Sequence, residues 1–509
     1  MVEIQDSLNQ MAKGAGILLI GSIFAKIINY FYRGYLARML SVSEFGMLNL
    51  GIMIITFIIA LATIGMESGL NRYVPFYSGL DNKNKVNGVI YFSAKSTLIV
   101  SVLMTIGLLL FSKQIASLFE GSSSLASLLI ILGIGVPFSV VGTRVFLNCL
   151  LYLKQVNVYS SIFNVLQHAF RLLLTVMLIY FGYGLFGAGV AYTASAVAIG
   201  IFSFYVFNLK FKLKKIDFDE KKDYLKYSLP LFLMTIFGYL NGWIDTFMVG
   251  YLLDNYNVGI YNAAFLISQL LILFPNIVLP LILPIVGPHF AKGKLNEVDL
   301  IAKQAAKWII VASTFTLIVL LSFPGTIIRI IFGAKYFPSI TPLSILSIGF
   351  FISTLVPLLM AFLSLHKRTK LILFNSIGVL LVNIILNLIL IPRYGIMGAA
   401  IGTAFSNLVL FLVLGIEAYL LFKTNLFSLK ILLTGIASIL PIILITFSKD
   451  LFQHNIAILT FIVLLSFCIY SVSILKLKVI DDADKHILKA FEEKINIKIL
   501  KAIFRFIAK

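Results

Sequence analysis

The sequence is poor in charged residues and in cysteine. Of its 509 residues, 12% are charged and 60% are hydrophobic, and the mean hydropathy is +1.02. A soluble core cannot bury that much apolar surface, so a soluble globular protein is excluded. The two cysteines, Cys149 and Cys468, lie within apolar runs, which predicts neither a disulfide framework nor a metal cluster. The composition predicts an all-α integral membrane protein.

The sequence also lacks the motifs of common enzymes. It contains no H-E-x-x-H, no P-loop and no paired-cysteine motif. The stretch GYGLFG at 182–187 matches G-x-G-x-x-G, but it joins two apolar runs, whereas the nucleotide fingerprint needs a strand before it and a helix after it. We therefore expect no catalytic residues, no metal site and no cofactor, and we predict that the protein is not an enzyme.

Apolar runs long enough to cross a bilayer as a helix occur fourteen times. The expected spans are residues 14–36, 46–77, 87–111, 123–152, 157–180, 184–207, 224–251, 257–289, 300–323, 339–364, 370–391, 395–422, 429–447 and 454–475. A count of twelve spans plus interfacial pieces remains an alternative. The first run is expected to be an uncleaved span, because no small-residue cleavage site follows it.

The chain repeats itself at an offset of 211 positions. Phe163 and Asn164 match Phe374 and Asn375, and the stretch 183–190 matches 394–401. Two six-span halves in the same orientation predict pseudo-symmetric lobes with a substrate site between them, and hence alternating access. The expected domains are an N-terminal lobe (1–208), a cytoplasmic linker (209–223), a C-terminal lobe (224–424), two further spans (425–475) and a basic amphipathic tail (476–509).

Most of the 41 Lys and Arg residues fall on one side of this topology. The opposite loops hold only Arg38, Lys113, Arg329, Lys335, Arg393 and Lys449. Because basic loops stay cytoplasmic, both termini are predicted to lie on the cytoplasmic side of a cell membrane. The net charge of +20 is then a topology signal, and no nucleic-acid partner is expected. The tail is expected to lie on anionic membrane lipids, or else to be a solvated helix.

The first span carries a polar stripe. Ser22, Lys26, Asn29 and Arg33 recur at intervals of four, three and four residues, which places them on one helix face. A cation at the bilayer centre costs about 3 kcal/mol on insertion scales, so it normally faces a protein interior or a watery cavity. The alternative is that both side chains extend to the membrane interfaces.

The first half holds further intramembrane cations, and the second half holds amides. Arg72, Lys95, Arg144 and Arg171 join Lys26 and Arg33, with Glu67 as the single acid in that half. A basic wall suits phosphate or pyrophosphate, and an amide wall suits sugar hydroxyls. The predicted substrate-binding residues are Lys26, Arg33, Arg72, Lys95, Arg144, Arg171, Asn164, His168 and Asn383. His168 has a second interpretation, as a buried hydrogen-bonded histidine.

Only three acids lie within the spans, and they are far apart in sequence: Glu67, Asp245 and Glu417. They are the candidates for coupling transport to a Na⁺ or H⁺ gradient.

The eighth span contains Pro275, Pro280, Pro284 and Pro288. Each proline removes a backbone donor and clashes with the preceding turn. We therefore expect this helix to be bent or interrupted, and to border the transport pathway or act as a hinge.

Three stretches resemble a known family: RGYLARMLSVSEFGMLNLG (33–51), GLNRYVPFYSG (69–79) and DTFMVGYLLDNYNVGIYNAA (245–264). They are similar to the Wzx-type oligosaccharide flippases of polysaccharide biosynthesis, in the multidrug/oligosaccharidyl-lipid/polysaccharide superfamily. The resemblance implies a transporter that moves a polyprenyl-linked oligosaccharide from the cytoplasmic to the outer leaflet. It also implies basic residues in the first-lobe cavity, and glycosyltransferases or a polymerase of the same pathway as partners. In the family pattern, Asp245 has a structural alternative.

Two other functions stay open from the sequence. A multidrug cation antiporter of the same superfamily would present acids to its substrate, whereas the first half presents six cations against one acid. A scramblase-like membrane protein would not need cations at the centres of helices.

Overall fold

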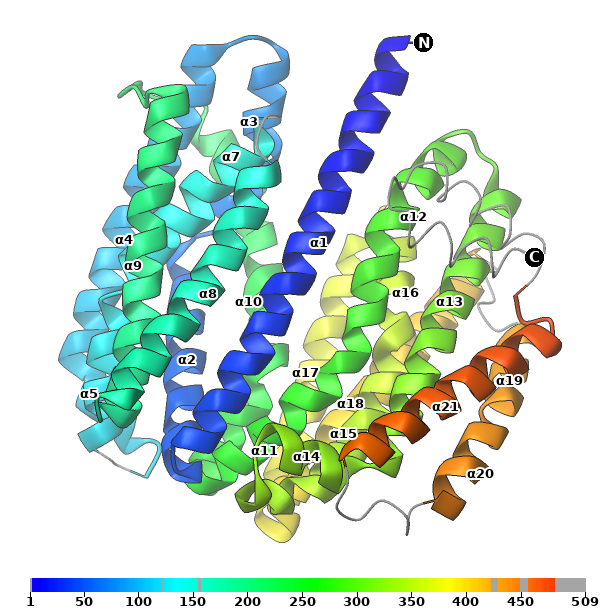
Figure 1. The fold of residues 1–509 in the computed structure, drawn as a ribbon. Coiled ribbons are helices and arrows are strands. Elements are labelled where there is room, and N and C mark those ends of the chain that lie inside the picture. The colour runs from blue at the N-terminus through cyan, green and yellow to red at the C-terminus, as the bar shows by residue number, and fades with distance from the viewer. Residues whose placement is uncertain (1, 121–122, 154–156, 423–428, 449–455, 481–509) are drawn as a thin grey trace. The chain divides into compact units, whose positions relative to one another are not determined.

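The structure, a computed structural model, describes residues 2–120, 123–153, 157–422, 429–448 and 456–480. All regular elements in these ranges are helices, so the predicted all-α fold is confirmed. Thirteen helical stretches of this part of the chain are long and apolar enough to cross a membrane, and they coincide with the second to fourteenth predicted spans. The predicted first span lies within α1 (Val2–Met39), one long unbroken helix (Figure 1). The predicted tail helix falls almost wholly outside the described residues.

The first half of the chain forms nine further helices and one π-helical segment. They are α2 (Val42–Ala62), α3 (Met66–Gly79), α4 (Lys83–Ser117), α5 (Ser123–Gly133), α6 (Val136–Phe138), the π-helix η1 (Ser139–Leu147), α7 (Asn148–Tyr152), α8 (Asn157–Tyr180), α9 (Gly184–Phe211) and, after the linker, α10 (Lys221–Leu252).

The second half continues with helices that are broken by three short 3₁₀ segments. They are α11 (Asn255–Ser268), η2 (Gln269–Ile272), α12 (Leu273–Ala291), α13 (Leu295–Ser322), α14 (Pro324–Ile331), η3 (Ala334–Ser339), α15 (Ile340–Ile352), η4 (Ser353–Leu355), α16 (Val356–Leu365), α17 (Thr369–Tyr394), α18 (Ile396–Phe422), α19 (Leu429–Ala437), α20 (Ile439–Ser448) and α21 (Ile456–Lys476).

The chain divides into two compact units, each assembled from separate segments. Unit 1 comprises Met1–Phe265, Ile328–Pro342 and Ser376–Thr403, and unit 2 comprises Leu266–Ile327, Leu343–Asn375 and Ala404–Lys509. In unit 1, a buried core joins α3, α4, α7, α9 and the start of α10. In unit 2, a second core joins α12, α13, α16 and α18. The division into two six-helix lobes stays a prediction.

Five predicted spans are interrupted in the described ranges: the second, the fourth, the eighth, the tenth and the thirteenth. The second span is split at Thr63–Gly65, where Ile64 and Gly65 have positive φ values of 47° and 70°, so α2 and α3 are separate helices. The eighth span is interrupted by η2, as expected from its prolines. Pro275 has no N–H to donate to the Leu271 carbonyl, and Leu271 lies in the 3₁₀ segment, which therefore replaces the lost α-helical turn.

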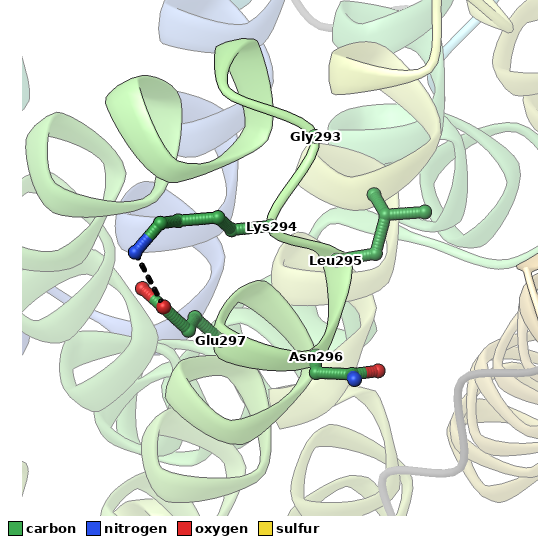
Figure 2. A pocket seen from close by; sticks show the side chains of 5 residues that line it. All are labelled: Gly293, Lys294, Leu295, Asn296 and Glu297. Carbon is green, nitrogen blue, oxygen red and sulfur yellow. Dashed lines mark hydrogen bonds and ion pairs between the residues drawn. The ribbon is translucent and has the colours of Figure 1, made fainter.

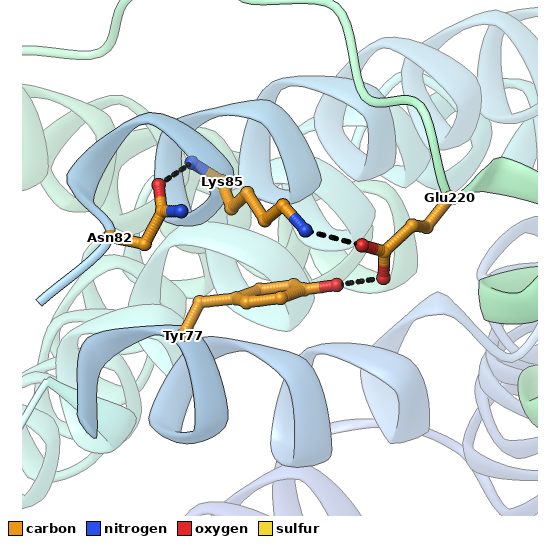
Figure 3. A network of polar contacts seen from close by, with 4 residues as sticks. All are labelled: Tyr77, Asn82, Lys85 and Glu220. Carbon is orange, nitrogen blue, oxygen red and sulfur yellow. Dashed lines mark hydrogen bonds and ion pairs between the residues drawn. The ribbon is translucent and has the colours of Figure 1, made fainter. Parts of the chain in front are cut away.

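Charged side chains stabilise the short connections between helices. In unit 2, the Lys294 ammonium lies 2.7 Å from the Glu297 carboxylate across the turn that joins α12 to α13 (Figure 2). In unit 1, Glu220 accepts hydrogen bonds from the Lys85 ammonium and from the Tyr77 hydroxyl (Figure 3). These bonds attach the end of the predicted linker to the hairpin between α3 and α4.

The Glu220 contacts predict a pH-dependent contribution to stability. The Lys85 ammonium and the Tyr77 hydroxyl both donate to the carboxylate and lower the pKa of Glu220. The stabilisation is thus complete above the pKa of an unfolded glutamate, about 4.3, and is lost as the pH falls through the lower folded value. Because the pair is partly exposed, we expect Glu220→Gln to cost at most about 1 kcal/mol at neutral pH.

Thermal unfolding in detergent between pH 3 and pH 7 measures this contribution. The difference between the wild type and Glu220→Gln should shrink below about pH 4.3. The control is Asp219→Asn, a substitution at the exposed neighbouring carboxylate. A difference that stays constant down to pH 3 would contradict the assignment.

Candidate functional site

Arg171 is a buried cation held by neutral groups. It lies on α8, and its side chain is 8% exposed. Its Nε donates to the Ser195 hydroxyl on α9 at 3.2 Å. Its guanidinium lies 4.0 Å from the ring centre of Tyr192 and 5.8 Å from that of Tyr32 on α1. Aromatic faces and a hydroxyl stabilise a guanidinium without neutralising it.

Arg33 lies on α1, beside Tyr32, and donates to the side-chain oxygen of the buried Asn49 on α2. Its Nε is buried without a hydrogen-bond partner among the described residues. Arg33 and Arg171 interact electrostatically with each other, although neither forms an ion pair with a carboxylate in the described ranges. This arrangement leaves two neighbouring positive charges and an unused donor.

Lys26 lies on the same stripe of α1, about 10 Å along the helix axis from Arg33. Its side chain is exposed, whereas Asn29 and Arg33 are half-buried. Lys26, Asn29 and Arg33 therefore lie on one face of α1, and the side chains on this face become more buried towards Arg33.

Arg144 has a carboxylate partner that the sequence alone did not suggest. Its guanidinium lies 3.6 Å from the Glu67 carboxylate on α3, and Asn148 donates to the same carboxylate at 2.9 Å. Arg144 lies within the π-helix η1, a rare backbone form that is frequent at functional sites. Glu67, predicted as a coupling acid, thus neutralises a predicted substrate-binding cation.

Arg72 and Lys95 are exposed and lie towards the linker end of unit 1. The Arg72 guanidinium lies 4.4 Å from the ring centre of Tyr227, near the start of α10. Lys95 interacts electrostatically with Asp217 of the linker. These two cations are therefore separated along the spans from the Arg33 and Arg171 pair.

Asn164 and His168 form a local contact within α8. A ring nitrogen of the half-buried His168 lies 2.9 Å from the backbone oxygen of Asn164, one helical turn earlier. The Asn164 side chain is exposed. The hydrogen-bonded histidine foreseen as the alternative is observed, and a substrate contact by either residue stays a prediction.

Asp245 lies at the centre of a second buried polar cluster in unit 1. Its carboxylate is held by Asn387 at 2.8 Å and Asn383 at 3.1 Å, both on α17, and by the Thr403 hydroxyl on α18 at 2.7 Å. The Asp245 residue is 4% exposed, and no cation pairs with it among the described residues. The amide of Asn383, predicted to bind substrate, therefore donates to a carboxylate.

The side-chain oxygen of Asn387 is buried and has no donor within the described part of the chain. It belongs to the same cluster as the carboxylate and amide oxygens of Asp245 and Asn383. These oxygens with the Thr403 hydroxyl form a set of hard ligands that suits a small cation.

Glu417, the third predicted coupling acid, lies in unit 2. Asn375 on α17 donates to its carboxylate at 2.7 Å. The predicted site residues thus form several groups: the arginine pair, the Arg144–Glu67 pair, the Asp245 cluster, the Glu417 contact and the exposed cations at the linker end.

A family model described as polysaccharide biosynthesis protein matches residues 11–294, which is more than half of the chain. The chain belongs to this family. The family predicted from the sequence is therefore confirmed. A second model, MatE, matches residues 230–389, in agreement with membership of the superfamily that the resemblance named.

Relatives in archaea extend these matches. An uncharacterized membrane protein, MJ1068, of Methanocaldococcus jannaschii is 25% identical over 89% of this chain and 94% of its own length. A probable flippase, AglR, of Haloferax volcanii is 27% identical over 48% of this chain and 52% of its own length. The chain thus spans about half of AglR.

A solved structure with the same fold is a lipid II flippase, MurJ, in an inward closed conformation. The TM-score is 0.72 and the identity 19%, over 91% of this chain and 98% of that one. This member of the polysaccharide biosynthesis family is therefore a multi-pass membrane protein with the fold of MurJ.

The sequence missed the partners that hold the buried charges. Tyr192 and Thr403 are equivalent positions of the 211-residue repeat, and each contacts a buried charge, Arg171 or Asp245. A comparison of the two repeat copies at these positions could have drawn attention to both.

Proposed function

We propose that this chain moves a polyprenyl-linked oligosaccharide from the cytoplasmic to the outer leaflet by alternating access. The main support is the pair of neighbouring guanidinium groups of Arg33 and Arg171. Aromatic rings, a hydroxyl and an amide hold them, and neither has a carboxylate partner among the described residues. Such a pair suits the pyrophosphate of a lipid carrier, which binds guanidinium groups through charge-assisted hydrogen bonds.

The other cations have distinct roles in this proposal. Arg72 and Lys95, exposed at the linker end, attract the anionic head group where it enters. Lys26 extends the positive face along α1, and Arg144 remains neutralised by Glu67 until the substrate competes for it. Cations at several depths favour passage, because one site that binds the anion equally in all states shifts no equilibrium.

The family match and the named flippases among the relatives support this function over the alternatives. AglR is named a probable flippase and MurJ a lipid II flippase. A transporter of cationic drugs would have to place its substrate against the uncompensated arginine pair, which would repel it.

We infer further that Asp245 couples transport to a cation gradient. The carboxylate oxygens of Asp245, the side-chain oxygens of Asn383 and Asn387, and the Thr403 hydroxyl are the groups that would hold Na⁺. A bound Na⁺ would supply the counter-charge that Asp245 does not receive from the described residues. Protonation of Asp245 would do the same for H⁺.

The first prediction from the arginine pair concerns transport. Arg171→Ala should reduce flipping of an NBD-labelled polyprenyl pyrophosphate in proteoliposomes by at least about tenfold, the cost of one lost charge-assisted contact. Arg171→Lys should rescue little, because lysine cannot match a planar guanidinium stacked on Tyr192.

Lys26→Ala should also reduce flipping, and Lys26→Arg should partly rescue it.

Lys113→Ala is the matched control, since this exposed lysine lies at the end of α4. It should leave flipping unchanged. Normal transport by both Arg171→Ala and Lys26→Ala, at wild-type expression, would remove the mechanism proposed for the cations.

The coupling proposal predicts a cation-dependent stability. Saturating Na⁺ should raise the unfolding temperature of the purified protein, because a ligand at 100 times its Kd stabilises the folded state by about 2.7 kcal/mol. Asp245→Asn should abolish this increase, whereas Glu417→Gln in unit 2 should retain it. Stabilisation by low pH alone would identify H⁺ instead, and no response to either would make Asp245 structural.

The localisation and orientation are also part of the proposal: a cell membrane, with both termini and the 209–223 linker in the cytoplasm, close to the glycosyltransferases that supply the substrate. In a Cys468→Ser background, an impermeant maleimide applied to whole cells should label Lys113→Cys but not Lys214→Cys. Labelling of Lys214→Cys alone would reverse the orientation.

A further inference from the structure

Cations cap the C-terminal ends of α1 and α14: Arg38 of α1 caps α14, and Lys335 of η3 caps α1. The Arg38 guanidinium donates to the carbonyls of Arg329 at 3.4 Å, Ile331 at 3.2 Å, and Ile330. In return, the Lys335 ammonium donates to the Arg38 carbonyl at 3.2 Å and to that of Leu40. The last carbonyls of a helix lack partners within it, and cations at this end also complement the helix dipole.

Three aromatic rings lie beneath these caps. Phe45, on the first turn of α2, packs 6.3 Å from Phe332 and 5.8 Å from Tyr336, centre to centre, and the last two rings are 5.5 Å apart. The three residues are at most 1% exposed. We call Arg38, Phe45, Phe332, Lys335 and Tyr336 the outer clasp.

The backbones also approach closely beside the outer clasp. A Cβ on Gly34 of α1 would lie 3.4 Å from Cγ2 of Ile331. On α2, a Cβ on Gly46 would lie 1.8 Å from the Asn255 carbonyl oxygen, and one on Gly259 would lie 2.3 Å from that of Val42. Only glycine at positions 46 and 259 permits this approach, so α2 and α11 contact each other through their main chains.

The outer clasp joins the two predicted lobes. Arg38 and Phe45 come from the N-terminal lobe, whereas Phe332, Lys335 and Tyr336 come from the C-terminal lobe, although the segment Ile328–Pro342 packs within unit 1. If two lobes rock against each other, contacts that join them at one end must break when that end opens.

The charges of the outer clasp are unusual for their predicted side. Arg38, Arg329 and Lys335 are three of only six basic residues in the predicted outer loops, and all three line one surface hollow. Arg38 and Lys335 are exposed. Their hydrogen bonds can therefore exchange for water at a small net cost, which suits a contact that forms and breaks repeatedly.

We propose that the outer clasp is a gate that keeps the predicted outer end closed and releases each time the transporter opens to that side. The proposal rests on the proposed function, because a gate requires alternating access. It assigns the Arg33 region a coupling role as well, since α1 is one continuous helix that carries both Arg33 and Arg38. An anion bound at Arg33 acts about 8 Å from the caps along the same helix axis.

The first test removes the caps and measures opening without any substrate. Leu50 on α2 is fully buried and contacts Gly250 of α10, so the thiol of Leu50→Cys reacts only when this region opens. In detergent, and in a Cys468→Ser background, Arg38→Gln with Lys335→Gln should speed maleimide labelling of Leu50→Cys by about tenfold. Arg393→Gln, an exposed cation in the last turn of α17, is the control and should change nothing.

The second test locks the gate. Copper phenanthroline oxidises the thiols of Gly34→Cys and Ile331→Cys to a disulfide. A disulfide requires Cβ atoms about 4 Å apart, and positions 34 and 331 are in close contact. In proteoliposomes, the oxidised protein should lose flipping of an NBD-labelled polyprenyl pyrophosphate, and a reductant should restore it. In the Cys468→Ser background, Gly34→Cys alone and Ile331→Cys alone should be insensitive to the oxidant.

The outcomes separate this proposal from the proposed function. Unchanged labelling in the cap variant overturns the gate. Flipping by the fully oxidised protein at the same rate as by the reduced protein also overturns it. If the cap variant speeds labelling while the reduced protein moves no probe, the gate stands and the proposed function fails.

Discussion

The cost of burying a charge is the constraint on which unit 1 depends. Arg171 and Asp245 are both at least nine-tenths buried, and neither is paired with an opposite charge among the described residues. Each is instead surrounded by neutral polar groups: rings and a hydroxyl around Arg171, amides and a hydroxyl around Asp245. Because several helices contribute these groups, satisfying the two charges fixes how α1, α8 and α9, and likewise α10, α17 and α18, pack together.

The internal repeat places one contact of each cluster at equivalent positions. At the offset of 211 residues, Tyr192 is equivalent to Thr403. The glycines at the corners are equivalent as well, since Gly184 and Gly395 have positive φ values of 47° and 58°. The equivalent positions Tyr192 and Thr403 therefore contact a cation in one copy and an anion in the other.

Irregular backbone occurs within predicted spans in both halves of the chain. The π-helix η1 holds Arg144 opposite Glu67, and η2 precedes the proline-rich α12. Inside a membrane, such departures from the α-helix are tolerated where protein or a watery cavity surrounds them. That these segments border a transport pathway stays a prediction, and hydropathy alone treats both as uninterrupted apolar runs.

The sequence by itself determined the helical membrane fold, the approximate spans and the repeat, because hydropathy and periodicity are local properties of the chain. It also identified the residue types of the site, since a charge within an apolar run is visible without a structure. Only the tertiary structure decided the partners: that Arg144 is neutralised by Glu67, that Asn383 donates to Asp245, and that Lys335 caps α1 nearly 300 residues away in sequence. Those pairings depend on which helices become neighbours. Packing between segments far apart in the sequence decides this, and the local pattern of one segment does not indicate which other segment it contacts.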